Sequence, residues 1–121
     1  MLHHPLSAVP GVLAVARFSG LLNAGAVKHA LLTAGVQLVL HGHEHSAFLA
    51  IERWPGRHER ELHIASAPSL GSREVAEPRG YNEIRVVREG LTRIDVSIQT
   101  VVQTGNAWEA RGEAVVFRVL R

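Results

Sequence analysis

The sequence predicts an α/β fold in the first half of the chain and antiparallel β-structure in the second half. Three hydrophobic patterns support this prediction. Apolar residues recur at the spacing of one helix face over residues 27–34. A continuous apolar run follows at residues 36–40, as expected for a strand covered on both faces of a sheet. Apolar and polar residues then alternate over residues 94–98, which is typical of a half-buried antiparallel strand.

The individual elements follow from local signals along the chain. Residues 5–21 mix proline, glycine and apolar residues and predict a long loop. Asn23 is suited to the N-cap of the following helix and Gly35 to its C′ position. His63 is expected on a strand with its side chain facing outward, and Trp108 is expected to pack rather than bind. Strands are predicted at residues 36–40, 47–54, 62–67, 94–98 and 115–119, and one more from residue 81 onward.

Composition narrows the class of protein. A chain of 121 residues corresponds to one domain or part of one, and the absence of cysteine leaves histidine and carboxylate as the plausible metal ligands. There is no apolar run of about 18 residues and no charged-then-apolar leader, so we expect a cytoplasmic protein with no membrane partner. The net charge is +2 and the arginines are dispersed, which does not favour a nucleic-acid surface.

Three histidines end the apolar run at every second position: His41, His43 and His45. On an extended backbone these side chains would lie on roughly one side, and Gly42 allows the backbone to turn between them. Because imidazole is the commonest metal ligand, the pattern predicts a metal site at the carboxyl end of a strand. The alternative interpretation is a solvated loop that is rich in histidine.

The segment Gly42-His43-Glu44-His45 resembles the Gly-His-x-His motif of the calcineurin-like metallophosphoesterases, and His3-His4-Pro5 resembles the motif that precedes it in that family. The resemblance implies an α/β fold that forms the C-terminal part of an α/β/β/α sandwich, with a mixed sheet and antiparallel strands in the second half. Pro68-Ser69 and the strand opening at Tyr81 are weaker matches.

The earlier family motifs, Asp-x-His, Gly-Asp and Gly-Asn-His, do not occur, and the first aspartate is Asp95. We therefore expect residues 1–121 to be a single partial metallophosphoesterase domain that lacks the N-terminal half with the other metal motifs. A half-domain leaves apolar faces and sheet edges exposed, so self-association through those edges is expected.

The resemblance also implies the reaction and the roles of individual residues. It implies hydrolysis of a phosphoric mono- or diester, a small-molecule substrate, at a dinuclear centre of iron, manganese or zinc. His3 and His43 would bind one metal ion and His45 the other. His41 would donate a hydrogen bond behind the metal ligands rather than bind a metal ion, and His4 would contact either the substrate or a ligand. As a fragment, the chain is expected to be inactive alone.

Two other functions remain open. The chain could be a truncated, non-catalytic paralogue that acts as a metal-binding or partner-binding module. It could also hold a structural zinc ion on histidines, in which case a fourth ligand would have to be recruited from His63 or Glu61. Asp-x-His and Gly-Asn-His motifs in the DNA upstream of Met1, in the same frame, would favour the enzyme.

Overall fold

The computed structural model describes residues 23–42, 45–54, 60–71 and 78–120. Contacts divide the chain into two compact units, Met1–Ala67 and Pro68–Arg121, and each is described here by itself. The expected single domain over residues 1–121 stays a prediction. The loop predicted for residues 5–21 lies outside the described residues. Within the described part, no helix is long and apolar enough to cross a membrane.

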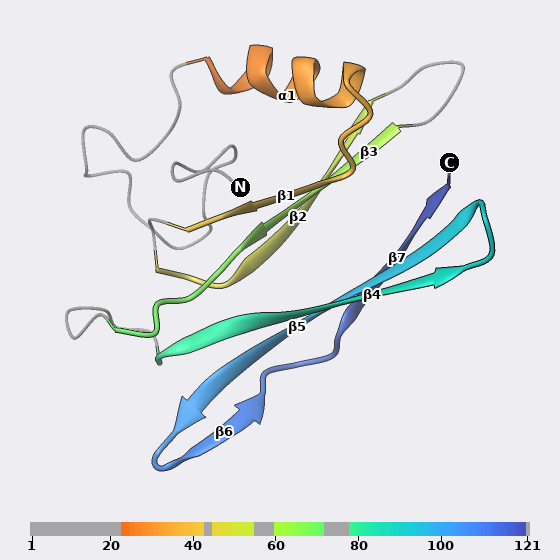
Figure 1. Ribbon diagram of the computed structural model, residues 1–121. Coiled ribbons are helices and arrows are strands. Elements are labelled where there is room, and N and C mark those ends of the chain that lie inside the picture. Colours follow the sequence, from red (N-terminus) through yellow and green to blue (C-terminus); the bar gives the residue numbers. More distant parts are fainter. Residues whose placement is uncertain (1–22, 43–44, 55–59, 72–77, 121) are drawn as a thin grey trace. The chain divides into compact units, whose positions relative to one another are not determined.

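Helix α1 (Ala24–Thr33) ends close to where the sequence predicts (Figure 1). Gly35 has a φ of 78°, and the Val36 amide donates to the Leu31 carbonyl at 2.9 Å, which closes the helix with the left-handed C-terminal turn expected of a glycine. Asn23 occupies the N-cap position, but its side chain makes no capping hydrogen bond. The position of this cap was therefore predicted correctly and its interaction was not.

Sheet A contains three strands, β1 (Leu38–His41), β2 (Phe48–Trp54) and β3 (Arg60–Ser66), in the order β1-β3-β2. Strand β1 runs parallel to β3, whereas β2 is antiparallel to it. This arrangement confirms the predicted mixed sheet. Strand β1 is shorter than its apolar run, and only its second and fourth residues are buried, so the expected coverage of both faces is not seen.

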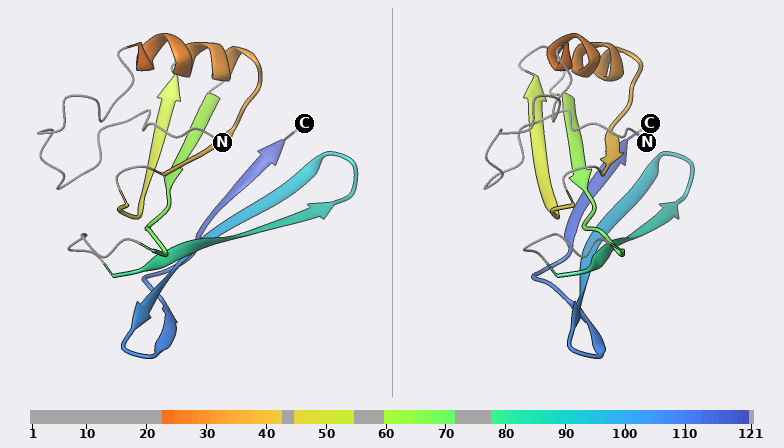
Figure 2. Two further views of the ribbon diagram at one scale, coloured as in Figure 1. Left: turned by 60° about the vertical axis from the view of Figure 1, so that its left-hand side comes forward. Right: turned by 90° about the vertical axis from the view of Figure 1, so that its left-hand side faces the viewer.

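One face of sheet A forms the core of the first unit. Leu32 of α1 packs on Val39, Leu62 and Ile64, which the strand register places on the same side of the sheet. We call this side the helix face. Figures 1 and 2 show α1 near the end of the sheet where β3 begins and β2 ends. The other end, where β1 and β3 finish, is the carboxyl edge of sheet A.

The expectation that His63 faces outward into solvent is wrong. Its side chain lies on the face opposite the helix face, but only 5% of the residue is exposed. Strand β3 is the central strand of sheet A, and five consecutive residues, Leu62 to Ser66, are buried. Leu38 of β1 and Ile51 of β2 are in register with His63, so side chains of both flanking strands lie beside it on this face and reduce its exposure.

Sheet B is antiparallel throughout, as the sequence predicts for the second half of the chain. It contains β4 (Gly80–Glu89), β5 (Arg93–Thr104), β6 (Ala107–Ala110) and β7 (Val115–Leu120). Strand β5 pairs with β4 on one side and with β6 and β7 on the other. Its alternating residues Val96 and Ile98 are buried, as predicted. Strand β6 was not predicted.

Gly80 fixes the start of β4 through a close approach of backbones. A Cβ atom at this position would lie 2.5 Å from the Val101 carbonyl oxygen and 2.8 Å from Cγ of Pro68. Only glycine fits there without a shift of the chain. The described residues are thus mostly β, with one helix, a mixed sheet and an antiparallel sheet.

Candidate metal centre

The carboxyl edge of sheet A brings three strand ends together. His41, the last residue of β1, is in register with Ser66, the last residue of β3, and Ser66 is also in register with Phe48, the first residue of β2. Because residues in register share a face, all three side chains lie on the helix face, beyond Val39 and Ile64. His41 is 2% exposed and Ser66 is fully buried. The rings of His41 and Phe48 are tilted, with centroids 5.5 Å apart.

Among the described residues, Nδ1 of the His41 side chain has a hydrogen-bond partner and Nε2 has none. Nδ1 lies 3.1 Å from the carbonyl oxygen of Gly42. A carbonyl oxygen only accepts, so Nδ1 carries the hydrogen in this contact. Nε2 is buried and has no hydrogen-bond partner in the described part of the chain. A histidine that binds a metal through one ring nitrogen usually donates the N–H of its other nitrogen to a carbonyl or carboxylate, and the His41 ring has this arrangement.

The backbone around His41 is also fixed. The Ala67 amide, just after β3, donates to the His41 carbonyl at 3.1 Å and extends the parallel pairing by one step. His45 is exposed and has a φ of 58°, whereas the next residue, Ser46, is buried. A positive φ is uncommon outside glycine and more frequent for histidine than for most residues. His45 therefore turns the chain back toward β2 with its own side chain accessible to solvent.

The other predicted site residues lie outside the described residues. They are His3, His4 and His43, together with the variable residue Glu44. The structure therefore places His41 at the carboxyl edge of sheet A and His45 in the segment that leads to β2. Among the residues described, no group of three histidine, cysteine or acidic side chains gathers in one place.

Glu61 and His63 do not belong to this edge. His63 is in register with Leu38, three positions before His41 along β1, which corresponds to about 10 Å along a strand. It also lies on the opposite face from His41, as does Glu61 two residues earlier. Neither residue can therefore complete a zinc site with His41, which removes this version of the structural-zinc alternative.

Glu61 and His63 instead form a polar group with Arg53. Glu61 accepts a hydrogen bond from Arg53 Nε at 2.8 Å, and this bond is the main reason that the pKa of Glu61 is lowered. Burial lowers the pKa of His63, and the nearby Glu61 carboxylate only partly opposes that effect. The 3.5 Å contact between Nε2 of His63 and Oε2 of Glu61 is therefore not an ion pair at neutral pH.

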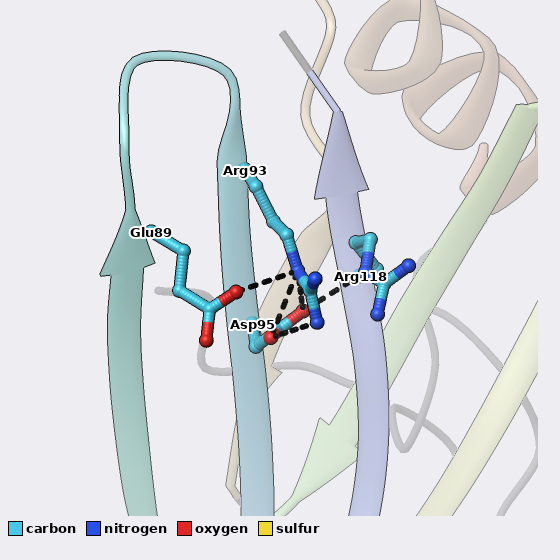
Figure 3. Close-up of polar contacts among 4 residues, drawn as sticks. All are labelled: Glu89, Arg93, Asp95 and Arg118. Atoms are coloured by element: carbon cyan, nitrogen blue, oxygen red, sulfur yellow. Dashed lines mark hydrogen bonds and ion pairs between the residues drawn. The ribbon is translucent and has the colours of Figure 1, made fainter.

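A second charged group lies on sheet B, where Figure 3 shows Arg93 between two carboxylates. Nε of Arg93 lies 3.1 Å from Oε2 of Glu89, and Nη2 of Arg93 lies 2.9 Å from Oδ2 of Asp95. Nε of Arg118 lies 3.1 Å from Oδ1 of Asp95. Hydrogen bonds from Arg93 and then Arg118 lower the pKa of Asp95. Two arginines face two carboxylates, so the charges balance and the group has no excess positive charge to attract a phosphate.

The sequence reasoning missed the neighbours of His41. Ser66 and Phe48 were placed on strands, but their position beside His41 depends on the parallel pairing of β1 with β3. The apolar run, the following strand and the short connections were the only available signals of that pairing. The carbonyl of Gly42 as the acceptor for Nδ1 was not foreseen.

No family model, curated protein or solved structure matches the chain. The resemblance to the calcineurin-like metallophosphoesterases therefore rests on the motif residues of the sequence.

Proposed function

We propose that the chain is the C-terminal part of a metal-dependent phosphoesterase that hydrolyses a phosphoric mono- or diester at a dinuclear metal centre. The observation that carries this proposal is the buried His41 ring at the carboxyl edge of sheet A, where Nδ1 is hydrogen-bonded to a carbonyl and Nε2 has no partner in the part of the chain that the structure describes. This is the chemistry of an imidazole prepared for a cation. Open α/β sheets commonly hold their sites at this edge.

In this proposal, His3 and His43 hold one metal ion and His45 holds the other, with iron, manganese or zinc as the cations. When bound, the metal pair lowers the pKa of a water molecule and neutralises charge on the phosphoryl group. His4 contacts the substrate or a ligand. Imidazole nitrogens suit all three metals, so the ligand types alone do not select among them.

His41 acts on the site through the main chain. Its Nδ1 donates to the carbonyl of Gly42, the residue directly before His43 in the sequence. This bond restricts the peptide that leaves β1, and it therefore limits the positions that the next side chain can take. This supporting role is the one that the resemblance implies for His41, and it uses Nδ1 alone and does not engage Nε2.

The remaining parts of the proposal concern the whole protein. The mixed sheet and the antiparallel sheet are proposed to form part of an α/β/β/α sandwich, which a segment carrying the Asp-x-His, Gly-Asp and Gly-Asn-His motifs would complete. A chain without such a segment would be the non-catalytic metal-binding or partner-binding module instead. The cytoplasmic location stays a prediction, and fractionation of cells that express the gene would test it.

The experiment replaces His43 by alanine in a form of the protein that carries the three earlier motifs. We expect the turnover of a chromogenic phosphodiester to fall by about 10³-fold or more, because the loss of a ligand removes the cation that activates water. His29→Ala is the matched control, since His29 is exposed on α1. Turnover of His43→Ala equal to that of the wild type at saturating metal would reject the proposal.

A further inference from the structure

We propose that His41 is itself a metal ligand and binds a divalent cation directly through Nε2. This inference rests on the proposed metal site and goes beyond it, because the resemblance gives a ligand role to His43 and His45 and only a supporting hydrogen-bond role to His41. It adds a third histidine of the segment 41–45 to the candidate ligand set. The argument depends on the tautomer, the burial and the position of His41.

The tautomer follows from the hydrogen bond to Gly42. At 3.1 Å, Nδ1 has the carbonyl oxygen as its partner, so Nδ1 carries the hydrogen atom. In a neutral imidazole the other nitrogen then carries the lone pair. Nε2 is therefore available as an electron-pair donor, and the backbone carbonyl that accepts from Nδ1 fixes the orientation of the ring.

Burial makes the lone pair at Nε2 unusual. The residue is 2% exposed, and Nε2 has no hydrogen-bond partner within the described residues. Most buried polar atoms do have a partner, because a buried acceptor without one has lost its bond to water and gained nothing in return. The ring also contacts Phe48, which limits its movement. A cation on Nε2 would remove this cost.

The position of His41 also suits a ligand. It ends β1, and the segment that follows carries the two histidines already proposed to bind metal. Imidazole donors favour borderline cations such as zinc and cobalt over magnesium, which prefers oxygen ligands. We therefore expect the cation on Nε2 to be of the zinc type.

The test is binding of Co²⁺ and Zn²⁺ to the 121-residue chain in the absence of substrate, with two substitutions at one position. In His41→Asn the side-chain amide can still donate to the Gly42 carbonyl, as Nδ1 does, but no atom reaches the place of Nε2. In His41→Leu both functions are lost. If Nε2 is a ligand, both variants should bind at least about tenfold more weakly than the wild type. His29→Asn, on the exposed side of α1, should bind as the wild type does.

Several outcomes would overturn the inference. Wild-type affinity in His41→Asn with weak binding in His41→Leu would show that His41 only positions the backbone. Absence of any binding to the wild-type chain would also reject it. If His41→Asn fails to fold by circular dichroism, ¹⁵N spectra of the wild-type histidines decide: the Nε2 resonance of His41 must shift on addition of Zn²⁺, and an unchanged resonance rejects the inference.

Metal binding and hydrolysis are separate readouts. A His41-dependent cation on a protein whose complete form hydrolyses no phosphoester would reject the proposed function and leave this inference standing. Loss of turnover in His43→Ala together with wild-type metal affinity in His41→Asn would support the proposed function and reject the inference about His41.

Discussion

His63 is a buried histidine whose environment disfavours its charged form. It lies on the central strand of sheet A, and burial lowers its pKa from the usual value of 6.5. The Glu61 carboxylate raises the pKa in turn, but it is the smaller influence. Glu61 is already engaged by Arg53, so its charge is partly compensated.

This environment predicts a pH dependence of stability. Between the lowered pKa of folded His63 and 6.5, the unfolded chain binds a proton at this residue and the folded chain does not. The contribution of neutral His63 to the free energy of unfolding is therefore fully present above pH 6.5. It is lost as the pH falls from 6.5 toward the lowered pKa. As the pH falls through this range, the free energy of unfolding measured by urea denaturation should decrease less steeply for His63→Gln than for the wild type.

The control for His63→Gln is His29→Gln, at an exposed position on α1. The account of His63 is wrong if the stability of His63→Gln declines with falling pH as steeply as that of the wild type and of His29→Gln.

The sequence identified the residue types of the candidate site but not their surroundings. The spacing of His41 and His45 indicated that both could serve one site, and His41 does lie at the end of a strand. The burial of His41 and the neighbouring Ser66 depend on which strand pairs with β1 and in what register. Those contacts join residues about 25 positions apart, and no local pattern encodes them.

At the scale of elements, the end of α1 depends on one glycine. Gly35 has a φ of 78°, so any other residue there is strained, although nothing lies within 4 Å of an added Cβ. Gly25 lies inside α1 with equally open surroundings and no positive φ. The two glycines therefore offer a matched pair in one helix.

Alanine should act in opposite directions at these two positions. Gly35→Ala should lower the free energy of unfolding by about 1 kcal/mol, because alanine is unfavourable in the left-handed region. Gly25→Ala should raise it by about 0.5–1 kcal/mol, because alanine favours the helix and restricts the unfolded chain. Thermal or urea denaturation followed by circular dichroism measures both. A stabilising Gly35→Ala would contradict the observed helix end.

Elements with a long periodic pattern could be predicted from the sequence, whereas the four-residue strand β6 could not. Helix α1 and strands β2, β3 and β7 appear within a few residues of their expected positions, whereas β5 begins as expected and continues to Thr104, past its expected end at residue 98. Strand β6 has four residues, all of them exposed, so it shows no apolar alternation. Its signal was the pair Gly105-Asn106, which connects β5 to β6 with Gly105 at a φ of 60°. The turn residues therefore offered a signal for β6 that the hydrophobic pattern did not, and the sequence prediction did not use it.

At the scale of the whole molecule, we expect the predicted self-association to use strand β4, an edge strand of sheet B. It has ten residues and pairs with β5 alone among the described strands. Val86 is 61% exposed and Val87 is 46% exposed. Arg85 precedes this pair and Arg88 follows it, and such flanking charges oppose uncontrolled pairing with another edge. Self-association stays a prediction, which sedimentation at increasing concentration would test.

The coarse fold could be predicted because each helix or strand follows from a local sequence pattern. The number of metal ions that the site can hold depends instead on carboxylate motifs that do not occur in this sequence. Three imidazoles from residues 41–45, with or without His3, carry no negative charge. Two dications a few ångström apart repel each other strongly, and carboxylates usually compensate that repulsion. The chain by itself should therefore hold one cation and not two.

The most direct test of the central claim is calorimetric titration of the purified 121-residue chain with Zn²⁺ and with Mn²⁺. A metal site at the carboxyl edge of sheet A that lacks its partner motifs should bind one Zn²⁺ weakly, and His45→Ala should weaken that binding further. Two tightly bound ions per chain would show that the site is already complete. No heat of binding with either metal would show that this edge is not a metal site.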